Sequence, residues 1–313
     1  MNLESTRKAY AEELVKLGSR DEKIMVLDAD LSSSTGTKKF GEAFPERFVN
    51  VGVAEQCLVD VAAGLAIAGK TVFASSFAMF LAGRAFEQVR NTVAHDSLNV
   101  KLVATHAGVT VGPDGSSHQC LEDLALMRVI PGMRVIAPAD AEETRQVIRT
   151  ISQEEGPFYV RLARPKTPVI FDSSHEFKLG KTYVVKEGTD ASIISTGIML
   201  ATALETASRL EEKGHSVQVI HAPTLKPVIK TRILDAAKRT GRIFTLEDHN
   251  IIGGLGSLVA EIVSGHGPCR VHRFGVPDVF GRSGEHDLLL DDLGLSSKQL
   301  YNRIRMILEE DKV

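Results

Sequence analysis

The most informative stretch of the chain is THAGVTVGPDGSSHQ, residues 105–119. It follows a run typical of a β-strand, NVKLVA at residues 99–104, and precedes a run typical of a helix, LEDLALM at residues 121–127. We therefore expect a long strand-to-helix loop, and such loops at the carboxyl end of a parallel sheet are where α/β proteins bind ligands. Gly108, Gly112 and Gly115 would let the backbone approach a ligand closely.

Three side chains of this loop, His106, Asp114 and His118, can exchange protons or bind hydroxyl groups. A solvated loop with ordinary polar residues is the alternative interpretation. Two imidazoles and a carboxylate within thirteen positions are an unusual concentration of such groups. We therefore interpret the loop as part of a binding or catalytic site.

Strand-like and helix-like runs alternate along most of the chain, which predicts an α/β protein whose mostly parallel sheets carry helices on both faces. The alternation lapses over residues 163–179, where Pro165, Pro168 and the polar run DSSHE indicate a linker. We therefore predict two domains, at residues 1–177 and 178–313. Asp140 is expected to cap the helix that begins at Ala141.

The composition excludes several classes of protein. Hydrophobic residues make up 43% of the 313 residues and charged residues 25%, as in ordinary soluble proteins. A net charge of −3 offers no field to recruit nucleic acid or a membrane surface. The three cysteines are widely spaced, which argues against a zinc site or a disulfide framework. With no signal peptide at the N-terminus and no apolar run long enough to span a bilayer, we expect a cytoplasmic protein.

The segment VGVAEQ at residues 51–56, together with the spacing of His106, Asp114 and His118, resembles the transketolase family. The resemblance covers nearly the whole chain. Its first unit resembles the pyrimidine-binding domain of thiamine-diphosphate enzymes, and its second resembles the transketolase C-terminal domain. The resemblance implies transfer of a two-carbon ketol unit from a ketose phosphate to an aldose phosphate, with thiamine diphosphate as cofactor, in the pentose phosphate pathway.

The resemblance assigns the cofactor contacts. Read alone, Glu55 would be a solvent-facing acid in the first turn of a helix. In the family, the matching glutamate hydrogen-bonds the ring nitrogen of the aminopyrimidine and favours its imino tautomer. A carboxyl group in an apolar pocket has its charged form disfavoured, so it can share a proton near neutral pH. The resemblance implies further cofactor contacts from Phe77, Phe80 and Asp30.

One cofactor contact departs from the family pattern. A third aromatic side chain is expected at the position of Gly83, and Phe73 or Phe86 could take its place. Read alone, Phe77 and Phe80 would be core residues, and Asp30 would cap a turn at the end of a strand.

The resemblance also assigns the substrate contacts. A sugar phosphate needs cationic donors at one end and hydroxyl partners near the reacting carbon. The residues implied for the phosphate end are Arg7, Ser34, His106 and Arg164. Asp114 would accept a hydrogen bond from a substrate hydroxyl beside the bond that breaks, and His118 would contact hydroxyls or assist proton transfer, which makes both catalytic candidates with Glu55. Arg161 lies close to Arg164 in the sequence, so the assignment between them stays open.

The second unit shows no comparable loop. Glu247 and His249 follow a predicted strand, and we assign them a structural role because the family's C-terminal domain mainly supports dimerisation. The chain has no Gly-Asp-Gly sequence, with which the family's diphosphate-binding domain holds the diphosphate and its cation. We therefore expect a second subunit that carries this domain with the Mg²⁺ or Ca²⁺ ligands, an α2β2 assembly, and no metal ligands here.

Two other enzymes and one non-enzyme are alternatives. Half of a 1-deoxyxylulose-5-phosphate synthase would carry a related loop, but Arg7 and the pair Thr105-His106 favour transketolase. The β subunit of a 2-oxoacid dehydrogenase E1 would not be expected to keep the spacing of His106, Asp114 and His118. A non-catalytic paralogue that regulates a thiamine enzyme is less consistent with an intact Glu55 and an intact loop.

Overall fold

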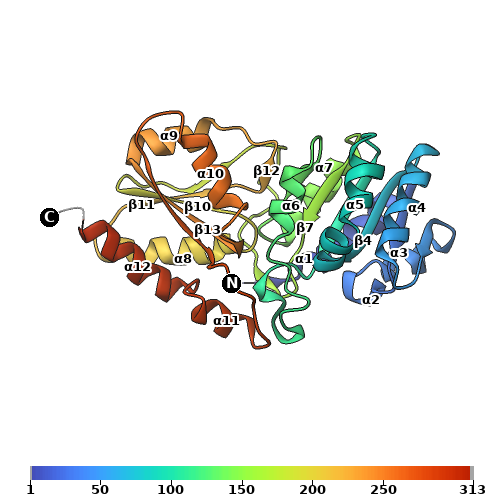
Figure 1. The fold of residues 1–313 in the computed structure, drawn as a ribbon, viewed down its shortest axis with the longest axis horizontal. Helices are drawn as coiled ribbons and strands as arrows, with labels where there is room; N and C mark the ends of the chain where they lie inside the picture. Colours follow the sequence, from blue (N-terminus) through green and yellow to red (C-terminus); the bar gives the residue numbers. More distant parts are fainter. Residues whose placement is uncertain (1, 311–313) are drawn as a thin grey trace.

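The computed structural model describes residues 2–310 and has two lobes, each built on its own sheet (Figure 1). The first lobe holds a seven-stranded sheet that is parallel except at one edge. Its strands, in spatial order, are β12 (Thr224–Lys226), β6 (Arg134–Ile136), β7 (Phe158–Arg161), β5 (Val100–Thr105), β4 (Thr71–Phe77), β2 (Ile24–Asp28) and β3 (Phe48–Asn50). β4 and β5 are buried along their whole length, as expected for central strands covered on both faces.

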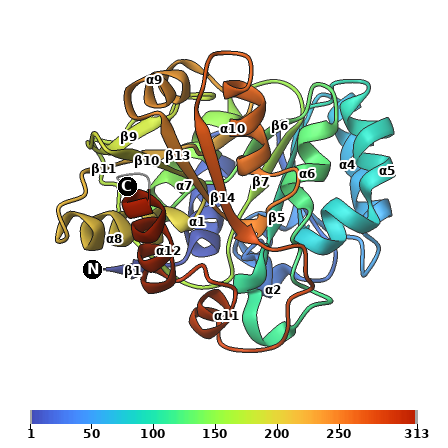
Figure 2. The same cartoon turned by 60° about the vertical axis from the view of Figure 1, so that its left-hand side comes forward.

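Helices cover both faces of this first sheet (Figure 2). On one face α1 (Thr6–Gly18) and α7 (Ala141–Ser152) bury Tyr10, Leu14 and Val147. The other face carries the elements α4 (Glu55–Ile67), η2 (Met79–Arg84), α5 (Phe86–Gln88), η3 (Val89–Ala94) and α6 (Asp123–Val129). The predicted cap of α7 is present, because the Asp140 carboxylate accepts from the Glu143 N–H at 2.8 Å.

Smaller elements complete the first lobe. The edge near β3 carries α2 (Ser32–Thr35), α3 (Lys38–Ala43) and η1 (Pro45–Arg47). β1 (Leu3–Glu4) pairs antiparallel with β8 (Thr167–Pro168), so the start of the chain is tied to the predicted linker.

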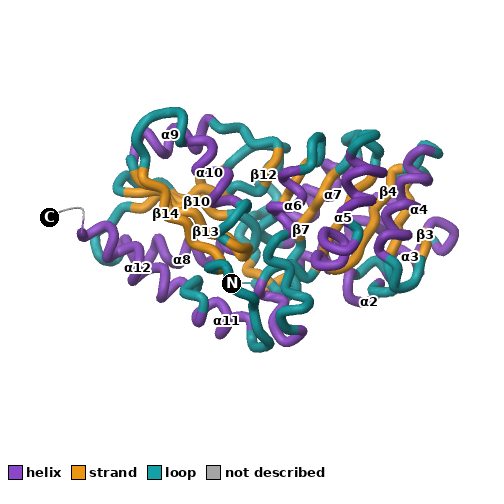
Figure 3. Tube along the Cα trace, viewed as in Figure 1, coloured by secondary structure: helices purple, strands orange, loops and turns teal. Residues whose placement is uncertain are grey.

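The second lobe holds a five-stranded sheet between two pairs of helices (Figure 3). The strand order is β14 (Arg270–Val276), β13 (Arg242–Asn250), β10 (Ala191–Ser195), β11 (Val217–His221) and β9 (Tyr183–Lys186), and only β9 is antiparallel. One face carries α8 (Met199–Glu211) and α12 (Ser297–Glu310), and the other carries α9 (Thr231–Thr240) and α10 (Leu255–Val263). α11 (His286–Asp292) lies below the junction of the two lobes.

The α/β fold expected from the sequence is therefore confirmed. The short strands β1, β8, β9 and β12 were not anticipated. Among them β12, from the second half of the chain, pairs with β6 and extends the first sheet. Between β8 and β9 the described chain has neither strand nor helix, and we keep the division into residues 1–177 and 178–313 as a proposal. None of the helices within residues 2–310 is long and apolar enough to cross a membrane.

Candidate functional site

The candidate residues gather at the carboxyl edge of the first sheet. β3 ends shortly before Glu55, and β4 ends at Phe77. β5 ends directly before His106, and β7 ends shortly before Arg164. These strands lie close together in the sheet, with only β2 between β3 and β4. Parallel strands deliver the residues that follow them to one edge, so segments far apart in the sequence form one surface.

An aromatic wall lies at the centre of this surface. The rings of Phe77 and His106 stack with their centroids 3.9 Å apart. The Phe80 ring meets His118 edge-on at 5.3 Å, and Phe77 and Phe80 are 6.1 Å apart. His106 has a φ of +56°, an uncommon conformation for a residue other than glycine, and such conformations cluster at functional sites.

His106 is a neutral hydrogen-bonding group. Its Nδ1 lies 2.9 Å from Thr105 Oγ1, and the side chain is buried. Burial, with the nearby Arg7, Arg164 and His118, lowers the His106 pKa from 6.5 to about 3. It lies beside the arginines, as the resemblance implied, but at neutral pH it can contribute hydrogen bonds to a phosphate and no charge.

The positive charge of the site comes from two arginines. Arg7 donates to the main-chain oxygens of Ser34 at 2.5 Å and Arg164 at 3.0 Å, so Ser34 contributes its carbonyl to the arrangement. Arg164 donates to the Val111 carbonyl at 3.1 Å, and its Nη2 lies 3.6 Å from Asp114 Oδ1. Burial, and then the charge of Arg164, lower the Arg7 pKa. Two cations can bind a phosphate and the carboxylate can accept from a hydroxyl, so this arrangement can bind a phosphorylated polyol.

Arg161 and Arg164 have different environments. The Arg161 side chain is buried, donates to the Asp123 carboxylate at 2.9 Å and donates to the Asp248 carbonyl at 2.6 Å. Arg164 is half-buried and lies in the site. The structure therefore favours Arg164 for the phosphate contact that the sequence left open.

Glu55 is buried, but an arginine faces its carboxylate. It is 1% exposed, and Arg84 Nη1 lies 2.7 Å from its Oε2. Ser76 Oγ is 3.5 Å from the other carboxylate oxygen. The Arg84 guanidinium also lies 4.7 Å from the centroid of the Phe80 ring. The expectation of a purely apolar pocket was therefore wrong, because a cation occupies one side of it.

No strong local pattern marks Arg84 as a site residue. It follows Gly83 at the end of η2, a π-helical segment, and such segments are frequent at functional sites. Phe73 cannot replace the aromatic residue expected at Gly83, because it is fully buried in the core beneath α1 and α7. Phe86 packs against the core on the other face of the sheet. In the described structure, the Phe80 ring contacts Phe77, His118 and Arg84.

Asp30 lies at the edge of the arrangement. It is exposed, has a φ of +64°, and accepts from Asn50 Nδ2 at 3.1 Å. No contact joins Asp30 to the aromatic wall within the described residues, so its role toward a cofactor stays a prediction.

Comparisons with known proteins agree with this architecture. Two families match in succession: the transketolase pyrimidine-binding domain over residues 4–169 and the transketolase C-terminal domain over residues 180–300. The chain belongs to the transketolase family. It is 50% identical over 301 residues to a Methanocaldococcus jannaschii protein described as "Putative transketolase C-terminal section", covering 95% of this chain and 94% of that protein.

Other transketolase relatives have the same extent. A 6-deoxy-6-sulfo-D-fructose transketolase subunit from Clostridium sp. is 38% identical, over 97% of this chain and 94% of the relative. A solved structure, described as a split gene transketolase in an inactive β4 tetramer, has 47% identity and a TM-score of 0.91. That alignment covers 98% of this chain and 99% of the other.

The residues present fit the aminopyrimidine part of thiamine diphosphate, the cofactor of transketolases. Arg84 is a flat N–H donor that lies over Phe80 and donates to the buried Glu55. An aminopyrimidine is also a flat ring, and it can lie against Phe80 while its ring nitrogen shares a proton with the Glu55 carboxyl group. Within residues 2–310, no cluster of three or more His, Cys, Asp and Glu side chains is arranged to hold a metal ion.

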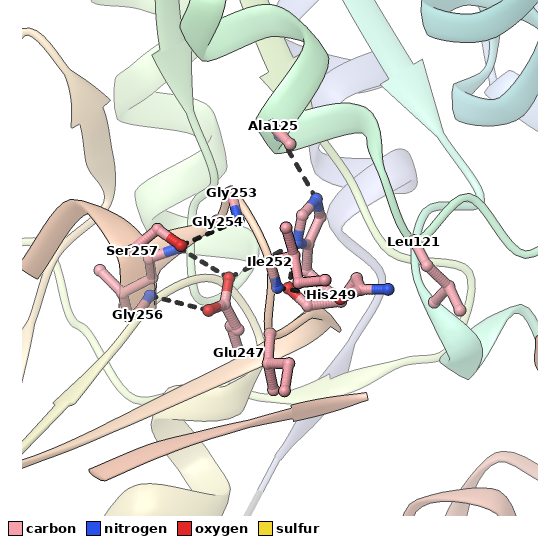
Figure 4. Close-up of polar contacts among 12 residues, drawn as sticks. Leu121, Ala125, Glu247, His249, Ile252, Gly253, Gly254, Gly256 and Ser257 are labelled. Atoms are coloured by element: carbon pink, nitrogen blue, oxygen red, sulfur yellow. Dashed lines mark hydrogen bonds and ion pairs between the residues drawn. The ribbon is translucent and has the colours of Figure 1, made fainter. Parts of the chain in front are cut away.

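Glu247 and His249 have structural contacts (Figure 4). The buried Glu247 carboxylate accepts from the Leu255 and Gly256 N–H groups, at 2.7 and 2.8 Å, and so holds the start of α10. Burial raises the pKa of Glu247 to about 7, against the opposing effect of these two hydrogen bonds. His249 Nδ1 lies 2.7 Å from the Asn250 carbonyl, and its Nε2 lies 3.4 Å from the Ala125 N–H.

Proposed function

We propose that this chain is one subunit of a thiamine-diphosphate-dependent transketolase that moves a two-carbon ketol unit from a ketose phosphate to an aldose phosphate. The observation that carries the proposal is a continuous series of contacts. Glu55 contacts Arg84, which lies over Phe80. The rings of Phe80, Phe77 and His106 follow one another. His106 lies near Arg7 and Arg164, and Arg164 faces Asp114. A heterocycle and a phosphorylated sugar need these groups in this order.

Each residue has a role that follows from its surroundings. Glu55 would hold the aminopyrimidine through a carboxylate shielded from water, with Phe77 and Phe80 against the ring. Bound thiamine diphosphate supplies a nucleophilic carbon and an electron sink for cleavage of the ketose C2–C3 bond. Arg7 and Arg164 would bind the phosphate.

Two loop residues would act near the reacting carbon. Asp114 would accept a hydrogen bond from a substrate hydroxyl there. His118 would contact the donor's hydroxyls or move a proton. The neutral His106 would add hydrogen bonds at the phosphate end.

The diphosphate and its Mg²⁺ or Ca²⁺ would be held by a separate subunit, in an α2β2 assembly. Support comes from relatives of nearly equal length, one described as a subunit, one as a C-terminal section and one as a split gene transketolase. The inactivity stated for the β4 tetramer of that last relative is what half a site would give. We keep the pentose phosphate pathway and the cytoplasm as the expected setting.

The experiment is an assay of the chain reconstituted with a candidate diphosphate-binding subunit. Xylulose 5-phosphate plus ribose 5-phosphate should be turned over. Pyruvate, with or without glyceraldehyde 3-phosphate, should not be. Activity on pyruvate alone would indicate an E1-like enzyme, and activity on pyruvate with the triose phosphate would indicate a 1-deoxyxylulose-5-phosphate synthase. No activity on any pair would favour a regulatory protein.

The proposed phosphate contact of Arg164 can be tested with a variant. Arg164→Met should raise KM for phosphorylated sugars more than it lowers kcat, because a phosphate is held equally in the ground and transition states. Lys166→Met removes an exposed positive charge nearby and is the matched control. If Arg164→Met lowers kcat/KM for unphosphorylated sugars as much as for phosphorylated ones, the phosphate role of Arg164 is wrong.

A further inference from the structure

The C-terminal domain reaches the candidate site through Asp248, a buried residue of β13 that is 2% exposed. Its Oδ1 accepts from the Val109 N–H at 2.8 Å. Its Oδ2 accepts from Thr110 Oγ1 at 2.7 Å and lies 3.4 Å from the Thr110 main-chain nitrogen. Every hydrogen bond described for this carboxylate therefore goes to the loop that carries Asp114 and His118, on the other domain.

The loop is shaped to admit this carboxylate. Gly108 precedes the two residues that Asp248 binds and has a φ of +80°, where side chains are strained. A Cβ at Gly108 would collide with Asp248 Oδ2. Glycine is therefore required both for the backbone conformation and for the close approach of the acid.

Asp248 is itself held in place from the first domain. Its main-chain carbonyl accepts from Arg161 Nη2 at 2.6 Å, and Arg161 donates to the buried Asp123 of α6 at 2.9 Å. A carboxylate whose own backbone is fixed can fix the position of the groups that donate to it.

Two further contacts hold the middle and the far end of the loop. Gln119 Nε2 donates to the carbonyl of Arg282 at 2.9 Å, and Ser283 Oγ donates to the carbonyl of Pro113 at 2.7 Å. Both partners belong to the segment between β14 and α11 of the C-terminal domain. The loop is therefore tied to that domain on both sides of Asp114.

We propose that Asp248 is a positioning residue for the substrate loop: the C-terminal domain sets the place of Asp114 and His118 without touching substrate. The role toward substrate rests on the proposed function, whereas the hold on the loop does not. Loops are ordinarily the mobile parts of a protein, and small misplacements of reacting groups cost rate. Buried hydrogen bonds to a charged acceptor order this loop before substrate arrives.

The test uses amide hydrogen exchange in the full chain. In Asp248→Asn, which keeps the shape of the side chain, we expect the amides of Val109 and Thr110 to exchange about tenfold faster or more. Thr110→Val removes one of the same bonds from the loop side and should act in the same direction. If Asp248→Asn does not fold, Thr110→Val decides.

Glu247→Gln is the matched control. Glu247 neighbours Asp248, is equally buried, and also accepts from two main-chain N–H groups, but both lie in α10 (Figure 4). This variant should speed exchange at Leu255 and Gly256 and leave the loop unchanged. Equal loop exchange in wild type, Asp248→Asn and Thr110→Val would overturn the proposal.

A second test measures the kinetics of the reconstituted complex. Asp248→Asn should lower kcat about tenfold or more. The cofactor dissociation constant should change less than twofold, because the described contacts of Asp248 include neither Glu55 nor the residues that contact it. An unchanged kcat beside a loosened loop would overturn the positioning role. A wild-type complex inactive on sugar phosphates would overturn the proposed function instead, and the exchange result would still decide whether Asp248 holds the loop.

Discussion

Some ionisable residues of the site are charged, and one of them, His106, is neutral. Arg7 and Arg164 supply the positive charge, and Asp114 offsets part of it, with its Oδ1 3.6 Å from Arg164 Nη2. His106 lies among them, yet its burial and the charges around it keep it neutral. A neutral imidazole can both donate and accept a hydrogen bond, so His106 can contact a phosphate without adding to the charge of the site.

The neutrality of His106 is directly measurable. At pH 6 its ring should show the NMR signals of a neutral imidazole, whereas the same histidine in the urea-unfolded chain should be mostly protonated. Because the pKa of the folded state lies below that of the unfolded state, the unfolded chain takes up this proton first. His106 therefore makes the protein less stable as the pH falls from about 6.5 toward 3. A folded-state titration between pH 6 and 7 would contradict this assignment.

The pair of Glu55 and Arg84 can be tested by a double-mutant cycle. Arg84→Met leaves a buried carboxylate without its cation, so the free energy of unfolding should fall by about 1–2 kcal/mol, a figure reduced for the exposure of Arg84. Adding Glu55→Gln should restore part of the loss, because no unpaired charge remains. The exposed Arg90→Met is the control, with a change within about 0.5 kcal/mol. Independent, additive effects would show that the two residues do not interact.

Among the helices and strands, the N-terminal caps of α7 and α1 differ, because the cap of α7 also binds the linker. The Asp140 carboxylate caps α7 with one oxygen, and the other oxygen accepts from the Ile170 and Phe171 N–H groups of the linker, at 2.7 and 2.8 Å. Ser5 caps α1 with a single, longer hydrogen bond of 3.3 Å at an exposed position. The Asp140 side chain therefore accepts more and shorter hydrogen bonds than the Ser5 side chain does.

The two caps should differ in their contribution to stability. Asp140→Ala removes a cap and leaves two partly buried linker N–H groups unpaired, so it should lower the free energy of unfolding by about 2–4 kcal/mol. Ser5→Ala should cost no more than about 1 kcal/mol. Urea unfolding of both variants gives the comparison. Equal losses would mean that the linker contacts of Asp140 contribute nothing.

Elements with a clear local pattern were predictable from the sequence, and contacts between distant elements were not. The strand before residue 105, the Asp140 cap and the helix that begins at Glu55 follow from hydrophobic spacing and capping residues. β12 is too short to show a period, and its partner β6 lies far away in the sequence. Arg84 and Asp248 act through side chains that meet only after folding, so no local pattern marks them.

At the scale of the whole molecule, the candidate site draws on both domains. The first sheet supplies the aromatic wall and the arginines, and the C-terminal domain fixes the loop through Asp248. The order of groups on this surface would accommodate a heterocycle and a sugar phosphate. The central claim is that the diphosphate and its cation are held by a different polypeptide.

Calorimetric titration of thiamine diphosphate with Mg²⁺ tests this claim most directly, using the 313-residue chain alone and then mixed with the diphosphate-binding subunit. We predict no stoichiometric binding and no turnover for the chain alone, and one cofactor bound per pair of subunits in the mixture. Stoichiometric binding and turnover of sugar phosphates by the unaccompanied chain would contradict the account.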